Sequence, residues 1–126
     1  MNDAVEAIKF AIPPTNEGEI YAGAFIRPDG TGHHTILLPG DNDDATWEEQ
    51  MEWAKSIGGD LPDRVEQAHF FKHLPEQFQR EWYWSNTQRE SGSAWFQNFG
   101  NGYQGWGYTG NKCRARAVRR VPFVIQ

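Results

Sequence analysis

The chain has one cysteine and no long hydrophobic run, and each of these shortages excludes a class of protein. Cys113 is the only cysteine among 126 residues, so an intramolecular disulfide and a CxxC metal site are excluded. No run of about 18 apolar residues occurs, so no membrane insertion is expected. The first residues lack a basic start followed by an apolar stretch. We therefore expect no secretory signal and synthesis in a reducing cytoplasm.

Basic residues are few as well, and they are unevenly placed in a chain whose net charge is −5. Residues 1–75 hold five Lys and Arg against fourteen Asp and Glu, whereas residues 76–126 hold seven against three. Opposite charges should draw the two parts together in the folded chain. The basic excess is too small to indicate a nucleic-acid partner, while the acidic part could meet a basic protein.

The hydrophobic pattern predicts a single α+β domain over residues 1–126, because strands come first, then two helices, then more strands. Residues 1–44 read as an N-terminal strand at 4–12 followed by a hairpin at 20–38. In that hairpin the sequence RPDG at 27–30 suits a tight turn.

Two helices are predicted from their end signals. Thr46 and Glu49 have the spacing of a capping box, and the diglycine at 58–59 stops the first helix. Asp63 and Glu66 repeat the capping spacing for a second helix that runs to about residue 74. Four short strands are expected after it, at 81–87, 93–99, 103–108 and 113–121.

Residues 92–108 combine six aromatic residues and five glycines without one charged side chain. Trp82, Trp84, Trp95 and Phe99 are expected in the core, whereas the glycine-flanked rings are expected on the surface. Exposed Tyr and Trp offer a large contact area at low entropy cost, and nearby amides supply hydrogen bonds. The predicted ligand-binding residues are Gln97, Asn98, Asn101, Tyr103, Gln104, Trp106, Tyr108 and Asn111.

Two clusters carry weaker signals. His69 and His73 stand four residues apart on the second helix, and Glu66 or Glu76 would have to complete a zinc site. The carboxylates at 41–44 lack the spacing of a calcium loop, so they are expected to be helix-end charge and a solvated loop. We therefore expect no metal and no cofactor.

The second half of the chain resembles a known family. The matching stretches are GGDLPDRVEQ at 58–67, EWYWSNTQ at 81–88, AWFQNFGNG at 94–102 and RARAVRRV at 114–121. Together they resemble the DUF1566 family, also called the Lcl C-terminal domain, in the small form common in phages and prophages. The similarity covers about residues 46–121 and leaves the N-terminal hairpin unmatched.

The resemblance implies a C-type-lectin-like fold, in which two helices pack on a small antiparallel sheet that the terminal strands close. It also implies binding, often to carbohydrate or to a cell surface, as the family's role. The chain has no EPN, QPD or WND triplet, so calcium-independent binding is expected.

The resemblance places the start of the second helix near the last strand. The run of Arg114, Arg116, Arg119 and Arg120 is therefore expected to pair with acidic residues of the first half, such as Glu66 or Asp63, and Glu66 is the preferred partner. Trp84 and Trp95 are likewise expected to be structural. A second interpretation stays open, in which the arginines at 114–120 bind phosphate or an anionic glycan.

The leading functional hypothesis is a non-enzymatic binding module, phage or prophage encoded, that recognises a cell-surface glycan or protein receptor through the aromatic and amide residues of the 97–111 hairpin. No residue set indicates an enzyme, and alternation points Cys113 into the core. Two alternatives remain. The protein could be an intracellular inhibitor that binds a host protein through residues 41–52, or a structural virion component. Assembly into a homo-oligomer and association with the virion stay open.

Overall fold

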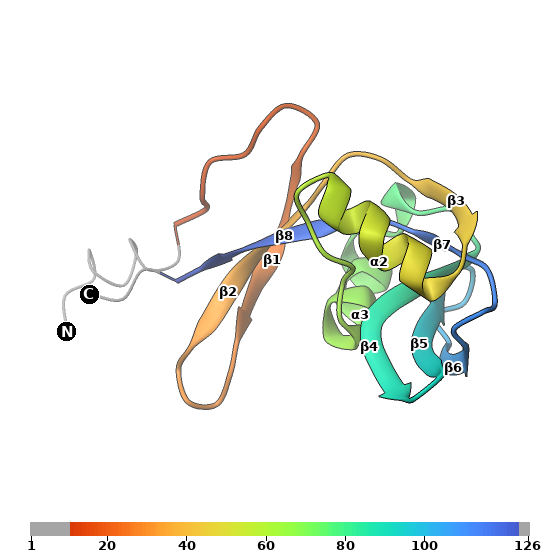
Figure 1. Ribbon diagram of the computed structural model, residues 1–126. Helices are drawn as coiled ribbons and strands as arrows, with labels where there is room; N and C mark the ends of the chain where they lie inside the picture. The colour runs from red at the N-terminus through yellow and green to blue at the C-terminus, as the bar shows by residue number, and fades with distance from the viewer. Residues whose placement is uncertain (1–10, 124–126) are drawn as a thin grey trace.

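The protein is described by a computed structural model over residues 11–123, which confirms the predicted α+β class (Figure 1). The strand predicted at 4–12 falls almost wholly outside these residues. The elements in chain order are β1 (Ile20–Ile26), β2 (Gly32–Leu37), β3 (Asn42–Ala45), α2 (Trp47–Ser56), α3 (Arg64–His73), the 3₁₀ turn η1 (Pro75–Gln77), β4 (Trp82–Glu90), β5 (Ser93–Asn98), β6 (Gln104–Tyr108), β7 (Cys113–Ala115) and β8 (Val118–Pro122).

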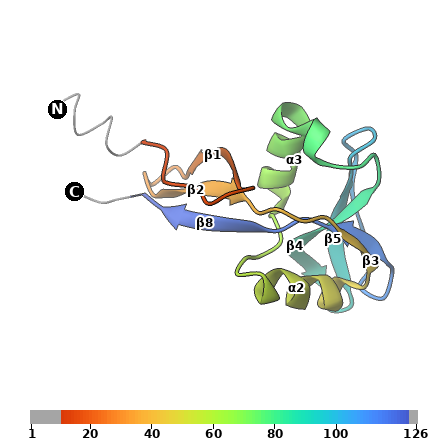
Figure 2. The same cartoon turned by 90° about the horizontal axis from the view of Figure 1, so that it is seen from above.

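The strands form two sheets. One has the order β1-β2-β8 and extends to one side of the molecule, while the other has the order β3-β7-β4-β5-β6 (Figure 1). Seen from above, the five-stranded sheet lies between the two helices, with α3 on one face and α2 on the other (Figure 2). Hydrogen bonds agree with this arrangement. Gln67 of α3 donates to the carbonyls of Tyr83 and Trp84, and Trp47 of α2 donates to the carbonyl of Ser85.

Each helix closes one part of the core. On the α2 side, Ala54 and Trp84 are fully buried together with the small side chains of β5 and β7. On the α3 side, Phe70 and Phe99 pack with Leu37 of the three-stranded sheet. The core therefore continues from one sheet to the other, and burial of these rings supplies much of the driving force for folding.

Both predicted capping boxes are present. The Thr46 side chain accepts from the Glu49 amide, and the Asp63 side chain accepts from the Glu66 amide, while each glutamate bonds back to the capping residue. The predicted hairpin at 20–38 is also confirmed, with its turn closed by a hydrogen bond from the Gly30 amide to the Arg27 carbonyl. These features depend on a few neighbouring residues, so the sequence predicts them well.

The last predicted strand, 113–121, is divided into two. Its first part is β7 in the five-stranded sheet, and its second part is β8 beside β2. Between them the guanidinium of Arg116 is buried and donates to the carbonyls of Gln77 and Leu38. Two sheets thus replace the single antiparallel sheet that was expected, and the pairing of β4 with β7 is parallel.

The acidic stretch at 41–44 differs from the solvated loop that the sequence suggests. Asn42–Ala45 forms β3, which pairs with β7. Asp41 accepts hydrogen bonds from Arg114 and from the hydroxyl of Tyr83. Burial raises the pKa of Tyr83 to about 12, and the Asp41 carboxylate acts in the same direction.

Arginines of the last strands join the two halves of the chain, as the charge distribution predicts. Arg114 lies 2.8 Å from Asp41, and Arg119 lies 2.9 Å from Glu19. The expected pairing of Glu66 with this arginine run is confirmed, and its partner is Arg120, at 2.6 Å.

Glu66 is a buried junction between α3 and the three-stranded sheet. Its carboxylate is fully enclosed and accepts from both Nε and Nη2 of Arg120, and from the Thr35 hydroxyl at 2.5 Å. The ring of His33 lies 3.3 Å away. Burial alone would raise the pKa of Glu66, but the hydrogen bonds and charge of Arg120, with help from Thr35, lower it below its ordinary value.

Acid is expected to destabilise the fold through these carboxylates. The hydrogen bond from Arg119 lowers the pKa of Glu19 from 4.5 to about 2, and the pKa of Glu66 is lowered as well. A carboxyl group whose pKa is lowered in the folded state stabilises the fold at pH values above its ordinary, unfolded-state pKa. This stability is lost as the pH falls through the pKa of the folded state. The urea midpoint should therefore be flat above about pH 5 and fall between pH 4.5 and about 2. In Glu66→Gln this fall should be smaller, and an identical fall in the variant would contradict the assignment.

Candidate functional site

The edge strand β6 carries the exposed aromatic residues. It is the last strand of the five-stranded sheet, so only one of its edges is paired within the sheet. The side chains of Trp106 and Tyr108 are 44% and 71% exposed, and Tyr103 just before the strand is 60% exposed. The predicted exposure of these three rings is thus confirmed.

Strand register places Trp106 and Tyr108 on one side of the sheet. Trp106 lies directly opposite Trp95 of β5, and Tyr108 lies opposite Ser93. Residues directly opposite each other, and those two apart along a strand, share a face. We call the side chains of Ser93, Trp95, Trp106 and Tyr108, with the two arginines that stack on them, the Trp106 face.

The two arginines, Arg64 and Arg89, reach this face from different elements. Arg64, the first residue of α3, places its guanidinium carbon 3.5 Å from the centre of the Trp95 ring. Arg89, near the end of β4, lies 3.9 Å from the centre of the Trp106 ring. A cation stacked on an indole is attracted to its π face, so both contacts hold the rings in place.

Tyr103 belongs to the opposite side of the sheet. Its ring lies 6.1 Å from that of Trp82, and Trp82 in turn lies 4.7 Å from Phe96. A Cβ on Gly105 would come within 2.8 Å of the Tyr103 ring, and one on Gly107 within 2.7 Å of the Phe96 ring. The glycines of β6 are therefore required because these two rings lie against its backbone. The three exposed rings do not form one surface.

Most of the predicted amide ligands are engaged inside the protein. Gln97 is only 1% exposed, and its Nε2 donates to the Gln67 carbonyl, so it lies outside any exposed surface, contrary to expectation. Gln104 donates to Gln97 and to the Arg64 carbonyl, which fixes the start of α3 against β6.

The other amides have local roles or stay free. Oδ1 of Asn98 accepts from the Gly100 amide, and Oδ1 of Asn101 accepts from the Tyr103 amide, so both shape the hairpin turn. Asn111 is exposed near Gly107 and remains available to a ligand on the Tyr103 side. The polar groups beside the exposed aromatic rings are therefore arginines and not the predicted amides. These arginines were not identified from the sequence as part of the site.

The four rings expected in the core divide into two groups. Trp84 and Phe99 are buried, as predicted. Trp82 and Trp95 are only partly buried. Each lies on the surface of the sheet, Trp82 beside the Tyr103 ring and Trp95 beneath the Arg64 guanidinium. The structural role expected for Trp95 is thus shared with a place in the exposed Trp106 face.

The remaining candidates do not form sites. His69 has its Nε2 2.7 Å from the Ala22 carbonyl and so fastens α3 to β1, and residues 11–123 hold no cluster of His, Cys, Asp or Glu arranged for a metal. Cys113 is buried, and this burial raises its pKa to about 12, which disfavours the thiolate. A hollow elsewhere on the described surface is lined by Asn16, Glu17, Glu19, Leu38, Pro39 and Ile57.

No protein-family model matches the chain, and no curated protein matches it in sequence. The resemblance to DUF1566 accordingly stays a prediction that depends on the motifs quoted above. None of the helices within the described part of the chain is long and apolar enough to cross a membrane.

Proposed function

We propose that the protein is a non-enzymatic binding module that recognises a cell-surface glycan through the Trp106 face. The observation that carries this proposal is the pair of exposed rings on an edge strand, one of them with an arginine 3.9 Å from its ring centre. A flat, accessible indole offers the kind of surface on which the apolar face of a sugar ring stacks. Tyr108 beside it adds a second ring and a hydroxyl.

Preorganisation supports the same proposal. Trp106 lies opposite Trp95, and each ring of this pair is stacked by an arginine. Rings that are already fixed lose little conformational entropy when a ligand binds, so more of the contact energy appears as affinity. The DUF1566-like motifs, with the phage or prophage origin and lectin-like fold they imply, are consistent with this role.

A second candidate function is supported by the acidic surface of β3 and α2. Asp43, Asp44, Glu48 and Glu52 are all exposed, and the side chain of Asp43 is 93% exposed. Such a strip would suit a basic host protein and an inhibitory role inside the infected cell. Charge reversal at Glu48 and Glu52 would abolish that interaction and leave glycan binding unchanged.

A glycan microarray probed with three proteins tests the first proposal. We expect the wild type to bind one glycan class, and Trp106→Ala to lose about ten-fold or more of that affinity because truncation of a stacked ring removes a central contact. Tyr103→Ala removes an equally exposed ring of the same hairpin on the opposite side, so it should bind like the wild type. Equal loss in both variants, or no glycan binding by the wild type, would contradict the proposal.

A further inference from the structure

The Trp106 face brings positive charge to a part of the chain that has none of its own. Residues 92–111 contain no charged side chain, yet Arg64 and Arg89 stack on rings from this stretch. Positive charge on an aromatic binding surface favours acidic sugars over neutral ones, because a cation on the protein is complementary to an acidic group on the ligand.

Arg64 differs from the arginines of the last strands. Arg114, Arg119 and Arg120 each face a carboxylate within 3 Å. Arg64 uses only its Nε, which donates to Oε1 of Gln104. Across residues 11–123 its two Nη groups have no hydrogen-bond partner. A half-buried guanidinium with free donors is an unfilled recognition group.

Stacking determines how an anion would approach. A guanidinium that lies on an indole presents its N–H donors outward from the edge of its plane, which is the direction from which a carboxylate binds in a bidentate manner. Between β4 and β6, on the same face, β5 presents Ser93, whose buried hydroxyl has no hydrogen-bond partner in the described structure. Arg64 therefore keeps unused donors beside this pair of rings, while the Ser93 hydroxyl is enclosed beneath them.

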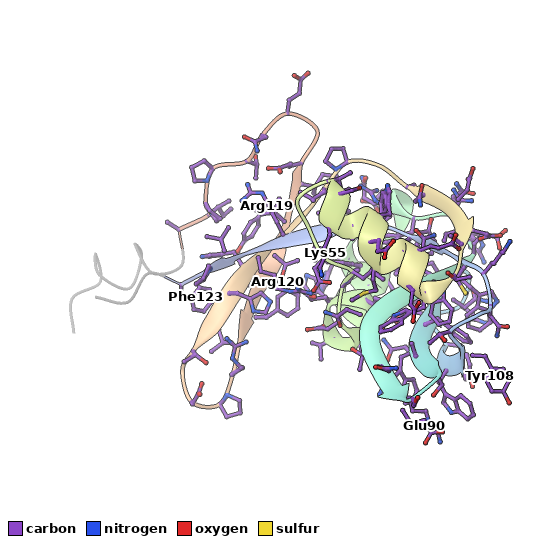
Figure 3. The ribbon with its side chains drawn as sticks, viewed as in Figure 1. Lys55, Glu90, Tyr108, Arg119, Arg120 and Phe123 are labelled. Atoms are coloured by element: carbon purple, nitrogen blue, oxygen red, sulfur yellow. The ribbon has the colours of Figure 1, made fainter. Side chains whose placement is uncertain are left out.

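Arg89 already holds a carboxylate, and that carboxylate comes from the neighbouring residue. Its Nη1 lies 2.9 Å from Oε1 of Glu90, an exposed side chain. Figure 3 shows Glu90 and Tyr108 at the same end of the molecule, remote from Phe123. Glu90 thus occupies the position that an acidic ligand would take, and it should compete with that ligand.

We propose that the Trp106 face selects an acidic polysaccharide, in which a uronic-acid ring stacks on the side of Trp106 that Arg89 leaves free while carboxylates of the polymer bind Arg89 and Arg64. This inference rests on the proposed glycan-binding function and names the ligand class. The chain is acidic overall, with a net charge of −5, so general attraction to polyanions does not account for such binding.

Isothermal titration with hexagalacturonate and with its methyl ester, which is the same chain without the charges, tests the inference. We expect the acid to bind and the ester to bind about ten-fold or more weakly, because a charge-assisted hydrogen bond is lost. Arg89→Gln should weaken binding of the acid by a similar factor and binding of the ester much less, because the ester loses only the stacking contact that holds Trp106. Glu90→Gln should strengthen binding of the acid, and a gain of affinity cannot result from misfolding.

The outcomes separate this inference from the proposal beneath it. If the acid and the ester bind equally well and Trp106→Ala binds neither, the inferred selectivity for acidic sugars is wrong. The proposal that the Trp106 face binds glycans would still hold. Binding of dextran sulfate as strong as that of hexagalacturonate would also overturn it, because the site would then attract any polyanion. Failure of both galacturonate forms overturns the inference, while the microarray separately decides whether neutral glycans bind.

Discussion

Replacing Glu66 with alanine is expected to lower the free energy of unfolding by about 3 kcal/mol. The carboxylate is fully buried and accepts from Arg120 and Thr35, so its removal leaves these donors without their acceptor. Arg120 keeps its contact with Asp60 at 2.7 Å, which places the loss at the lower end of the range for broken buried pairs. Urea denaturation followed by tryptophan fluorescence measures the change.

Glu49→Ala is the matched control. Glu49 occupies the same capping-box position in α2 that Glu66 occupies in α3, but it is exposed and contacts no arginine in the described structure. Its replacement removes a cap without opening a buried ion pair, so the effect should be clearly smaller. If the two variants lose equal stability, the capping box and not the buried network accounts for the role of Glu66.

Truncation of Trp84 to alanine is expected to lower the free energy of unfolding by about 3–5 kcal/mol, as for other large-to-small changes of buried rings. Trp84 is completely buried in the core between β4 and α2, and its indole donates to the Ala45 carbonyl. The change removes a large ring and leaves that carbonyl unpaired.

The same truncation at Trp106 should cost less than about 1 kcal/mol, because it removes only an exposed ring and its stacking with Arg89. Thermal unfolding of both variants beside the wild type provides the measurement. A loss at Trp106 as large as that at Trp84 would show that Trp106 stabilises the fold, and its exposure would then no longer indicate a binding role.

Local patterns allowed much of the fold to be predicted. Both capping boxes and the 20–38 hairpin are encoded within a few residues, and the structure has them where the sequence places them. The break at Arg116 could not be foreseen, because it depends on carbonyls at Gln77 and Leu38 that are distant in the chain. The strand character of 42–45 likewise comes from pairing with β7.

The site shows the same division. Glycine neighbours correctly predicted that Tyr103, Trp106 and Tyr108 are exposed. Their separation onto two faces depends on strand register and on which rings lie against Gly105 and Gly107, and neither is visible in composition. The arginines were missed because Arg64 is more than thirty residues from the ring it covers. No sequence signal marked either arginine, because each has a carboxylate as its direct neighbour, Asp63 beside Arg64 and Glu90 beside Arg89.

The most direct measurement is a titration of nitrogen-15-labelled protein in which the indole Nε1–H signals of the six tryptophans are followed. Hexagalacturonate and a neutral hexaose would be added in parallel. The account predicts shifts at Trp106 and Trp95, with Trp47 and Trp84 unmoved because their indoles donate to internal carbonyls. Shifts confined to Trp82, on the Tyr103 side of the sheet, would contradict the account. So would the absence of any shift, both with these two sugars and with the glycans that the microarray identifies.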